Sequence, residues 1–304
     1  MTKQYTQVLG DVFNTPWAIM PGKLESICGV LESRLAGGHS FSAAELEQMA
    51  LANKPPEHAT GSSIAVLPLW GTIHHHAGIV QQASGGTCDV QFGRQFKEAM
   101  ANNEVGTIVI HAKTPGGSVH GAQETSDLIF NHRGTKPIIT IVDAQCASKG
   151  YWIGTAADEM YVTPSGEVGS IGVVMAHRDI SKAEEQEGRK TTLIAIPENK
   201  VAGNPYEPLS DETVAEIKAD SKVYYDSFVE SVARNRGATT TTVHETFGRG
   251  SMVLAQKAAA LGMVDGIKTF DQVIADIQSN HSGGRRTSAS RRRELQLAQA
   301  ENQA

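Results

Sequence analysis

The sequence predicts an α/β protein. Three apolar runs have the composition of buried strands, and a segment with helical character follows each of the last two. The runs are Ile64–Ile73, Thr107–His111 and Pro137–Val142. The last two end in turns rich in small residues, and α/β proteins place their chemistry at the carboxyl ends of strands. These two turns are therefore the first places to look for a functional site.

Residues 1–60 are predicted to form a helical extension ahead of the core. Pro21 and Gly22 precede a helix whose apolar residues share one face. These residues are Leu24, Ile27, Val30, Leu31 and Leu35. A second helix, Ser42–Asn53, ends before a pair of prolines. A helix pair of this kind packs on its own core or docks a partner.

Three adjacent histidines, His74–His76, follow the first strand of the core. Neighbours in an extended chain point in alternating directions and cannot all face one metal ion, so a solvated loop is favoured over a metal site. The next stretch, Ala77–Val90, is rich in Gly, Ser and Thr and is interpreted as a loop before a helix that starts near Gln91. A gating role for this loop stays open.

The core domain is predicted to extend from residue 61 to residue 278. Its second half is expected to hold further helices and a strand. Asp179–Gly188 is expected to be an exposed helix and Thr191–Ile196 a strand. A long helix then begins after its cap, Ser210, and ends at Gly237. Its apolar face, for the core or for a subunit contact, comprises Val214, Ile217, Tyr224, Phe228 and Val232. The basic segment 279–304 is predicted to be a disordered tail.

Ser148 is the first candidate nucleophile because it follows the apolar run Pro137–Val142 and opens a helix of small residues. The alternative is that Ser148 is only a helix N-cap, which is the commoner role of a serine in such a place. Cys146 is a rival nucleophile two residues earlier. Because cysteine is among the most often buried residue types, a packed position at the end of a strand is the favoured interpretation of Cys146.

Two further segments contain residues that could act together with Ser148 in a catalytic site. Gly116 and Gly117 follow the second strand and supply backbone N–H groups that no side chain obstructs, as an oxyanion hole needs. A plain Pro-Gly turn is the alternative there. Lys200 lies in a polar loop before the long helix, and it could act as a general base if burial lowered its pKa. A solvated lysine is the alternative for Lys200.

Together, five sequence blocks resemble the signal peptide peptidase A family of serine/lysine peptidases. They are P-G-G-S at 115–118, A-S-K-G-Y-W at 147–152, A-D-E-M-Y-V-T-P at 157–164, G-S-I-G-V at 169–173 and K-V-A-G-N-P-Y-E-P-L-S at 200–210. Their order and spacing make the resemblance specific, and it extends from about Ile64 to Ile267. The segment 247–265 also resembles the family, in a helix and a Leu-Gly-x-Val-Asp turn expected to close the domain.

The resemblance implies a fold like that of ClpP and the crotonases, with repeated β-β-α units. It implies that Ser148 is the nucleophile and that Lys200 is the general base, which in single-domain members meets the serine of a neighbouring subunit. Ser170 matches the serine that orients the lysine, and Gly116 and Gly117 match the oxyanion hole. No metal or cofactor is implied. A triad based on His111, His120 or His177 is the rival mechanism that geometry leaves open at this stage.

The segment Phe13–Glu25 resembles the lead-in of phage prohead proteases, a branch of the same family that trims scaffold and capsid proteins. This resemblance implies a homo-oligomer in the host cytoplasm and prohead interior, with protein substrates and possible self-cleavage. The basic tail would then act as scaffold or as an address, and a nucleic-acid contact is ranked lower. The alternatives are a bacterial cytoplasmic signal-peptide-peptidase-like protease, a non-proteolytic crotonase-fold enzyme acting on acyl-CoA, and a structural capsid protein.

Composition excludes several other classes. The net charge of −6 over 304 residues argues against a nucleic-acid binder that uses its whole surface. Three widely spaced cysteines fit a reduced protein rather than a disulfide framework. No secretory signal or run of about 18 apolar residues is visible, which departs from the membrane-anchored members of the family.

Overall fold

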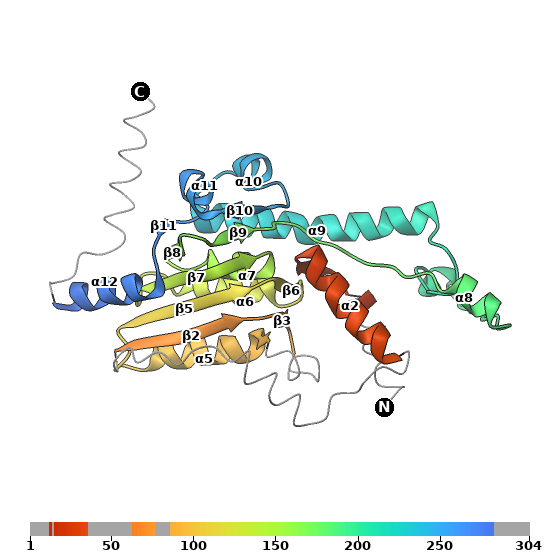
Figure 1. The fold of residues 1–304 in the computed structure, drawn as a ribbon, viewed down its shortest axis with the longest axis horizontal. Coiled ribbons are helices and arrows are strands. Elements are labelled where there is room, and N and C mark those ends of the chain that lie inside the picture. Colours follow the sequence, from red (N-terminus) through yellow and green to blue (C-terminus); the bar gives the residue numbers. More distant parts are fainter. Residues whose placement is uncertain (1–11, 14, 36–62, 77–85, 283–304) are drawn as a thin grey trace.

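The computed structural model describes residues 12–13, 15–35, 63–76 and 86–282. The predicted helix at 42–53, most of the loop after the three histidines and nearly all of the predicted tail lie outside the described residues. Within the described part, two sheets and the helices around them form an α/β fold (Figure 1). The predicted fold class is therefore confirmed.

The larger sheet contains all three predicted strands. Its main path runs in the order β10-β9-β7-β5-β2, and β8 pairs with both β7 and β11. The bounds are β2 (Ile64–Trp70), β5 (Thr107–Thr114), β7 (Ile138–Ala147), β8 (Glu159–Val162), β9 (Glu167–Gly169), β10 (Met252–Leu254) and β11 (Gly266–Ile267). The pairs of β5 with β2 and β7 are parallel. Parallel pairing aligns the carboxyl ends of these strands at one edge of the sheet.

The smaller sheet is built just beyond those carboxyl ends. Its order is β1-β6-β3-β4, with β1 (Trp17–Ile19), β3 (Ile73–His74), β4 (Thr87–Cys88) and β6 (Gly116–Ser118). β3 follows β2 and β6 follows β5 along the chain. The strand β1 comes from the predicted N-terminal extension and pairs with β6, so backbone hydrogen bonding ties this extension to the core.

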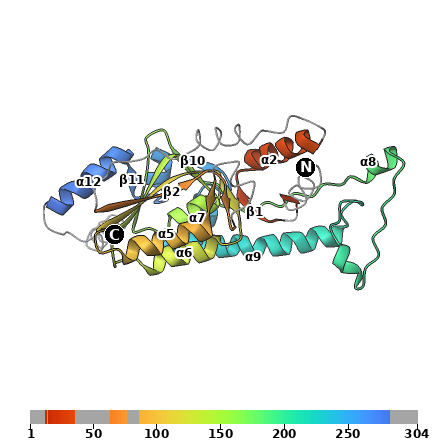
Figure 2. The ribbon, with the colours of Figure 1, turned by 90° about the horizontal axis from the view of Figure 1, so that it is seen from below.

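Helices cover both faces of the larger sheet, because side chains of a strand alternate between faces. Ile108 and Ile110 on β5 join the main core, whereas Val109 between them packs with residues of α12 (Phe270–Ser282). The main core lies under α5 (Asp89–Ala101), α6 (Ala122–Asn131), α7 (Lys149–Gly154) and α9 (Asp211–Arg236). Figure 2 shows α5, α6 and α9 on one side of the sheet and α12 on the other.

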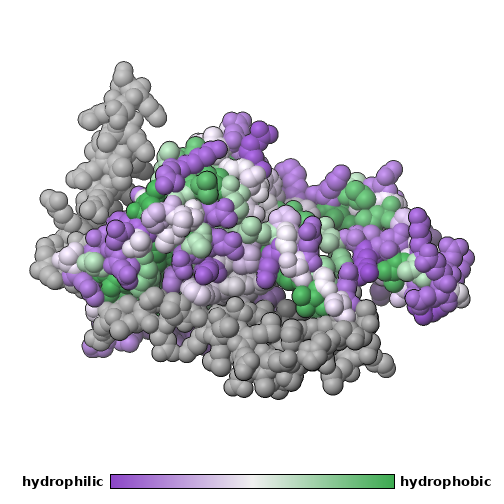
Figure 3. All heavy atoms as spheres, in the orientation of Figure 1, coloured by the Kyte–Doolittle hydropathy of each residue, from purple (hydrophilic) through white to green (hydrophobic). Residues whose placement is uncertain are grey.

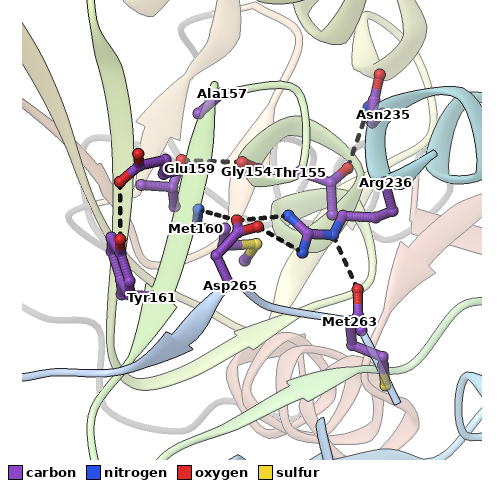
Figure 4. Close-up of polar contacts among 12 residues, drawn as sticks. Gly154, Thr155, Ala157, Glu159, Met160, Tyr161, Asn235, Arg236, Met263 and Asp265 are labelled. Atoms are coloured by element: carbon purple, nitrogen blue, oxygen red, sulfur yellow. Dashed lines mark hydrogen bonds and ion pairs between the residues drawn. The ribbon is translucent and has the colours of Figure 1, made fainter. Parts of the chain in front are cut away.

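The end of α9 is locked to the sheet by a polar cluster. The Arg236 guanidinium donates to both carboxylate oxygens of Asp265, to Oδ2 at 2.7 Å and to Oδ1 at 3.1 Å, and Oδ2 also accepts the N–H of Met160 in β8 (Figure 4). Asp265 follows α11 (Ala255–Ala260), in the segment that the sequence predicts to close the domain. Bidentate arginine–carboxylate pairs are geometrically specific, so this contact fixes three elements together.

The N-terminal helix α2 (Pro21–Leu35) partly follows its predicted apolar face. Leu24 and Leu31 are buried in a small cluster with Trp17 and Ile19 of β1. Val30 was also expected on this face, but it is 51% exposed. Since Val30 directly precedes Leu31, a helical step of about 100° turns it toward the side of the helix rather than toward the cluster.

An arm projects from the core between β9 and the buried end of α9 (Figure 1). It carries α8 (Ser181–Gln186), the 3-10 helix η1 (Glu198–Val201) and the first turns of α9, and none of the residues in α8 or η1 is buried. The helix α9 begins after its cap Ser210, whose side chain accepts the N–H of Thr213, and ends before Gly237, as predicted. Its buried residues begin only at Phe228.

The prediction of a strand at Thr191–Ile196 is wrong for the single chain. This part of the arm has no regular structure, because no other strand of the described chain lies beside it to accept its hydrogen bonds. Its apolar side chains remain outside the core, with Ile194 92% and Ile196 94% exposed. Apolar residues are visible on the arm in the space-filling view (Figure 3).

Candidate active site

Ser148 stands at the junction of β7 and α7 in a strained backbone conformation. Its φ is 52° and its ψ is −119°, values that residues with a side chain rarely adopt. Such a conformation costs about 1–3 kcal/mol and is typical of nucleophiles at sharp strand-to-helix turns. The side chain makes no capping hydrogen bond, so the alternative that Ser148 is an ordinary side-chain N-cap is not supported.

One neighbouring turn, at residues 169–172, contacts Ser148 twice. Its N–H donates to the Gly169 carbonyl at 2.7 Å, and its hydroxyl lies 3.4 Å from the Gly172 carbonyl. Ser170 lies between these two glycines, is buried, and has a positive φ of 54°. Its own N–H donates to the Ser251 carbonyl at 3.0 Å. The structure therefore brings the turn containing Ser170 beside Ser148.

The two predicted oxyanion glycines also lie next to Ser148. A Cβ atom added to Gly116 would stand 3.0 Å from the Ser148 Cβ. The N–H of Gly116 donates to the Thr114 hydroxyl at 3.0 Å, and Gly117 pairs with Ala18 in the β1–β6 ladder. In this structure the N–H of Gly116 is thus engaged within the chain, and the oxyanion role of the two glycines stays a prediction.

Lys200 is not brought to Ser148. It lies in η1 on the projecting arm and is exposed, with its N–H donating to the Pro197 carbonyl. The arm rejoins the core only through the later turns of α9. Among the described residues, no titratable side chain hydrogen-bonds to the Ser148 hydroxyl, whose partner is the Gly172 carbonyl.

A buried ion pair directly behind the nucleophile is missing from the sequence-based prediction. Lys149 Nζ donates to Asp89 Oδ2 at 2.7 Å and to the His120 carbonyl at 2.6 Å, and its side chain is fully buried. His75 Nδ1 lies 3.0 Å from the other carboxylate oxygen of Asp89. Burial lowers the pKa of Lys149, while the charge of Asp89 opposes that shift. The available signal was a single lysine in the otherwise uncharged helix Lys149–Gly154.

The predicted solvated loop of three histidines is only partly correct. His74 belongs to β3, and its Nε2 is buried without a hydrogen-bond partner among the described residues. Burial, aided by the nearby Lys149 cation, lowers the pKa of His74 to about 4. His75 turns to Asp89 instead. The described residues hold no group of three side chains suited to a metal ion.

The rival nucleophile and the rival triad receive no support from the geometry. Cys146 is fully buried in β7, and burial raises the pKa of its thiol, which keeps the thiol protonated. His111 packs between Trp70 and Phe270. His120 contacts Tyr224 through its ring and Lys149 through its carbonyl. Within the described chain, no histidine ring hydrogen-bonds to the Ser148 hydroxyl.

The fold and this site define an α/β protein with a strained serine between a glycine turn and a second small-residue turn. Comparison with known proteins gives the family: Peptidase family S49 matches residues 131–282, which is half of the chain and includes Ser148, Ser170 and Lys200. The chain belongs to this peptidase family, in agreement with the predicted resemblance.

Two similar proteins come from bacteriophages. Capsid assembly protease C of Escherichia phage lambda is 30% identical over 74% of this chain and 53% of its own length. Head-tail preconnector protein GP5 of Enterobacteria phage P21 is 26% identical over 93% of this chain and 60% of its own length. Protease 4 of Haemophilus influenzae is 29% identical over 70% of this chain. The chain thus spans between half and two thirds of the length of the two phage proteins.

A solved structure of an enoyl-CoA hydratase/isomerase family member aligns with a TM-score of 0.44 and 14% identity, over 80% of this chain and 82% of its own. Within the part of the chain that the structure describes, no helix combines the length and the apolar character needed to cross a bilayer.

Proposed function

We propose that the protein is a serine endopeptidase of the capsid-assembly type, with Ser148 as nucleophile and Lys200 as general base. The observation that carries the proposal is the strained turn at Ser148 beside the glycine pair at 116–117. The membership in a peptidase family supports it. The names of the phage relatives support capsid or scaffold proteins as substrates in the host cytoplasm or the prohead interior.

The proposed chemistry is acyl transfer in two steps. The Lys200 amine accepts the proton of the Ser148 hydroxyl while the oxygen attacks a peptide carbonyl, and the tetrahedral oxyanion is held by N–H groups of the glycine turn. The proton then passes to the leaving amine, and water hydrolyses the ester by the same route. Ser170 would accept or donate a hydrogen bond that orients the lysine.

We propose that Lys200 acts across a subunit boundary in a homo-oligomer. Two observations favour this: Lys200 is exposed on the arm, and the Ser148 hydroxyl has no base within the described chain. The exposed Ile194 and Ile196 on the same arm would bury against the neighbour, and each such burial is worth about 1.5–3 kcal/mol. Docking there would also remove Lys200 from water, which favours its neutral form.

The first test is the intact mass of wild type beside Ser148→Ala, with and without casein as an unfolded substrate. The wild type should cut casein or itself, and Ser148→Ala should leave both whole. Equal cutting by both chains would show that Ser148 is not the nucleophile. If neither chain cuts even when mixed with capsid protein, the proposal of a peptidase is overturned.

Mixing two inactive variants tests the subunit boundary. Ser148→Ala and Lys200→Ala are each expected to be inactive, and an equal mixture should recover about a quarter of wild-type activity if sites combine residues from two subunits at random. No recovery would place the lysine in the same chain as the serine. Lys190→Ala, another exposed lysine of the arm, is the matched control and should keep full activity.

A further inference from the structure

The strand β1 lies between the two backbone segments that flank Ser148. On one side it pairs antiparallel with β6, with Ala18 opposite Gly117 and Ile19 opposite Gly116. On the other side, Trp17 exchanges two hydrogen bonds with Val174, at 2.9 and 2.8 Å. Val174 follows closely on Gly172, whose carbonyl contacts the Ser148 hydroxyl. A segment from the N-terminal part of the chain therefore fills the space between these two edges.

The backbone of β1 comes close to the nucleophile. The point where a Cβ of Gly116 would stand lies 2.2 Å from the Ala18 carbonyl oxygen, 3.0 Å from the Ile19 Cα and 3.0 Å from the Ser148 Cβ. The Ile19 Cα and the Ser148 Cβ are therefore separated by at most twice this last distance. The Ala18–Ile19 peptide group is thus a direct neighbour of the serine.

Its hydrogen bonding is that of an added strand. Met20 donates to the Pro115 carbonyl at 2.9 Å, and Val119 donates to the Pro16 carbonyl at 3.1 Å. Antiparallel ladders alternate with a period of two residues, so Ala18, midway between these bonds, faces Gly117 in a hydrogen-bonded pair. The same Gly117 N–H is expected to serve as an oxyanion donor. While β1 is in place, it uses backbone groups that a substrate would need.

A peptidase binds its substrate as an extended segment, because backbone pairing with a sheet edge holds a peptide carbonyl in reach of the nucleophile. Both edges beside Ser148 are already paired with β1. The central residue of this pairing, Ala18, is small and fully buried. An external peptide can therefore pair with these edges only after β1 leaves.

Resting on the peptidase function proposed above, we propose that β1 is a built-in occupant of the polypeptide-binding cleft at Ser148. An extended substrate segment with a small residue at the position of Ala18 replaces it. The strand is short, and its side chains are anchored by the cluster of Trp17 and Ile19 with Leu24 and Leu31 of α2. Activity is then set by the equilibrium between this occupied state and an open state.

The test measures peptide binding directly, so it does not depend on cleavage. A fluorescent peptide with the sequence of residues 15–20 is titrated into full-length Ser148→Ala and into the double variant Ser148→Ala/Ala18→Pro. Proline at position 18 removes a donor from the centre of the β1 ladder and disfavours its pairing. The double variant should bind the peptide at least about tenfold more tightly, which corresponds to about 1.4 kcal/mol. A peptide with proline in place of its alanine should not bind.

Equal affinity of the two chains overturns the proposal, as does loss of binding in a double variant whose far-UV circular dichroism is unchanged. If Ala18→Pro does not fold, Trp17→Ala takes its place, because it removes the anchor of β1 without altering the backbone. In chains with an intact Ser148, whichever of these two β1 substitutions folds should lower KM for casein and leave kcat unchanged. A chain that binds the peptide but cuts nothing would refute the peptidase function and leave the strand exchange standing.

Discussion

Replacing Lys149 by methionine is expected to lower the free energy of unfolding by about 3 kcal/mol. Lys149 and Asp89 have side-chain exposures of 0% and 1%, and the Nζ–Oδ2 distance is 2.7 Å. Removing one partner of a buried pair leaves the other charge buried without its counter-ion, which typically costs about 3–5 kcal/mol of stability. The low end applies here because His75 still contacts the second oxygen of Asp89 at 3.0 Å.

Urea unfolding at a fixed protein concentration measures this cost, since any association would make the midpoint depend on concentration. The matched control is Lys222→Met in the pair Lys222–Asp226, whose side chains are 69% and 40% exposed. Exposed pairs of this kind contribute less than about 1 kcal/mol. If the two variants lose the same free energy, the reasoning that burial makes the Lys149 pair critical is refuted.

Two further predictions concern the smaller sheet. Gly117→Ala should lower the free energy of unfolding by several kcal/mol, and the melting temperature with it, because the new Cβ would lie 1.8 Å from the backbone oxygen of Ile73. Gly22→Ala, with open space around the new Cβ, should be neutral or stabilising. Equal melting temperatures of the two variants would contradict the prediction. His74 has its pKa lowered from 6.5 to about 4, so the unfolded state binds its proton first and stability falls as the pH drops from 6.5 towards 4. The loss should reach about 3 kcal/mol, and His74→Phe should remove that part of the acid sensitivity in urea titrations at pH 7.5 and 4.5.

Elements held by local sequence signals were the predictable ones. The apolar runs gave β2, β5 and β7, and the cap Ser210 and the terminal Gly237 set the limits of α9. The expected strand at 191–196 has the right composition, but a strand also needs a partner, and the described part of the chain supplies none to it. The strand β1 has only three residues, and its partners lie about a hundred or more residues away, so no local pattern could reveal it.

The candidate site was predictable to the extent that its residues lie at strand ends. Ser148, Ser170 and the glycine pair at 116–117 come together because their strands share one sheet edge. Lys200 lies instead in η1 on the arm, exposed, and no hydrogen bond joins it to Ser148 within the described part of the chain. The Lys149–Asp89 pair escaped prediction because its two residues are 60 positions apart and charge complementarity has no signature in sequence spacing.

The pairing of β1 also constrains how the chain folds while it is synthesised. One partner of this strand, Gly116–Ser118, leaves the ribosome about a hundred residues after it, and the other, Val174, later still. At about 5–20 residues per second, the apolar segment Trp17–Ile19 waits roughly 8–30 s for its second edge. The cleft and the strand inside it are therefore completed at the same moment. Under the proposal that β1 occupies the cleft, the completed site of a nascent chain would begin in its occupied state.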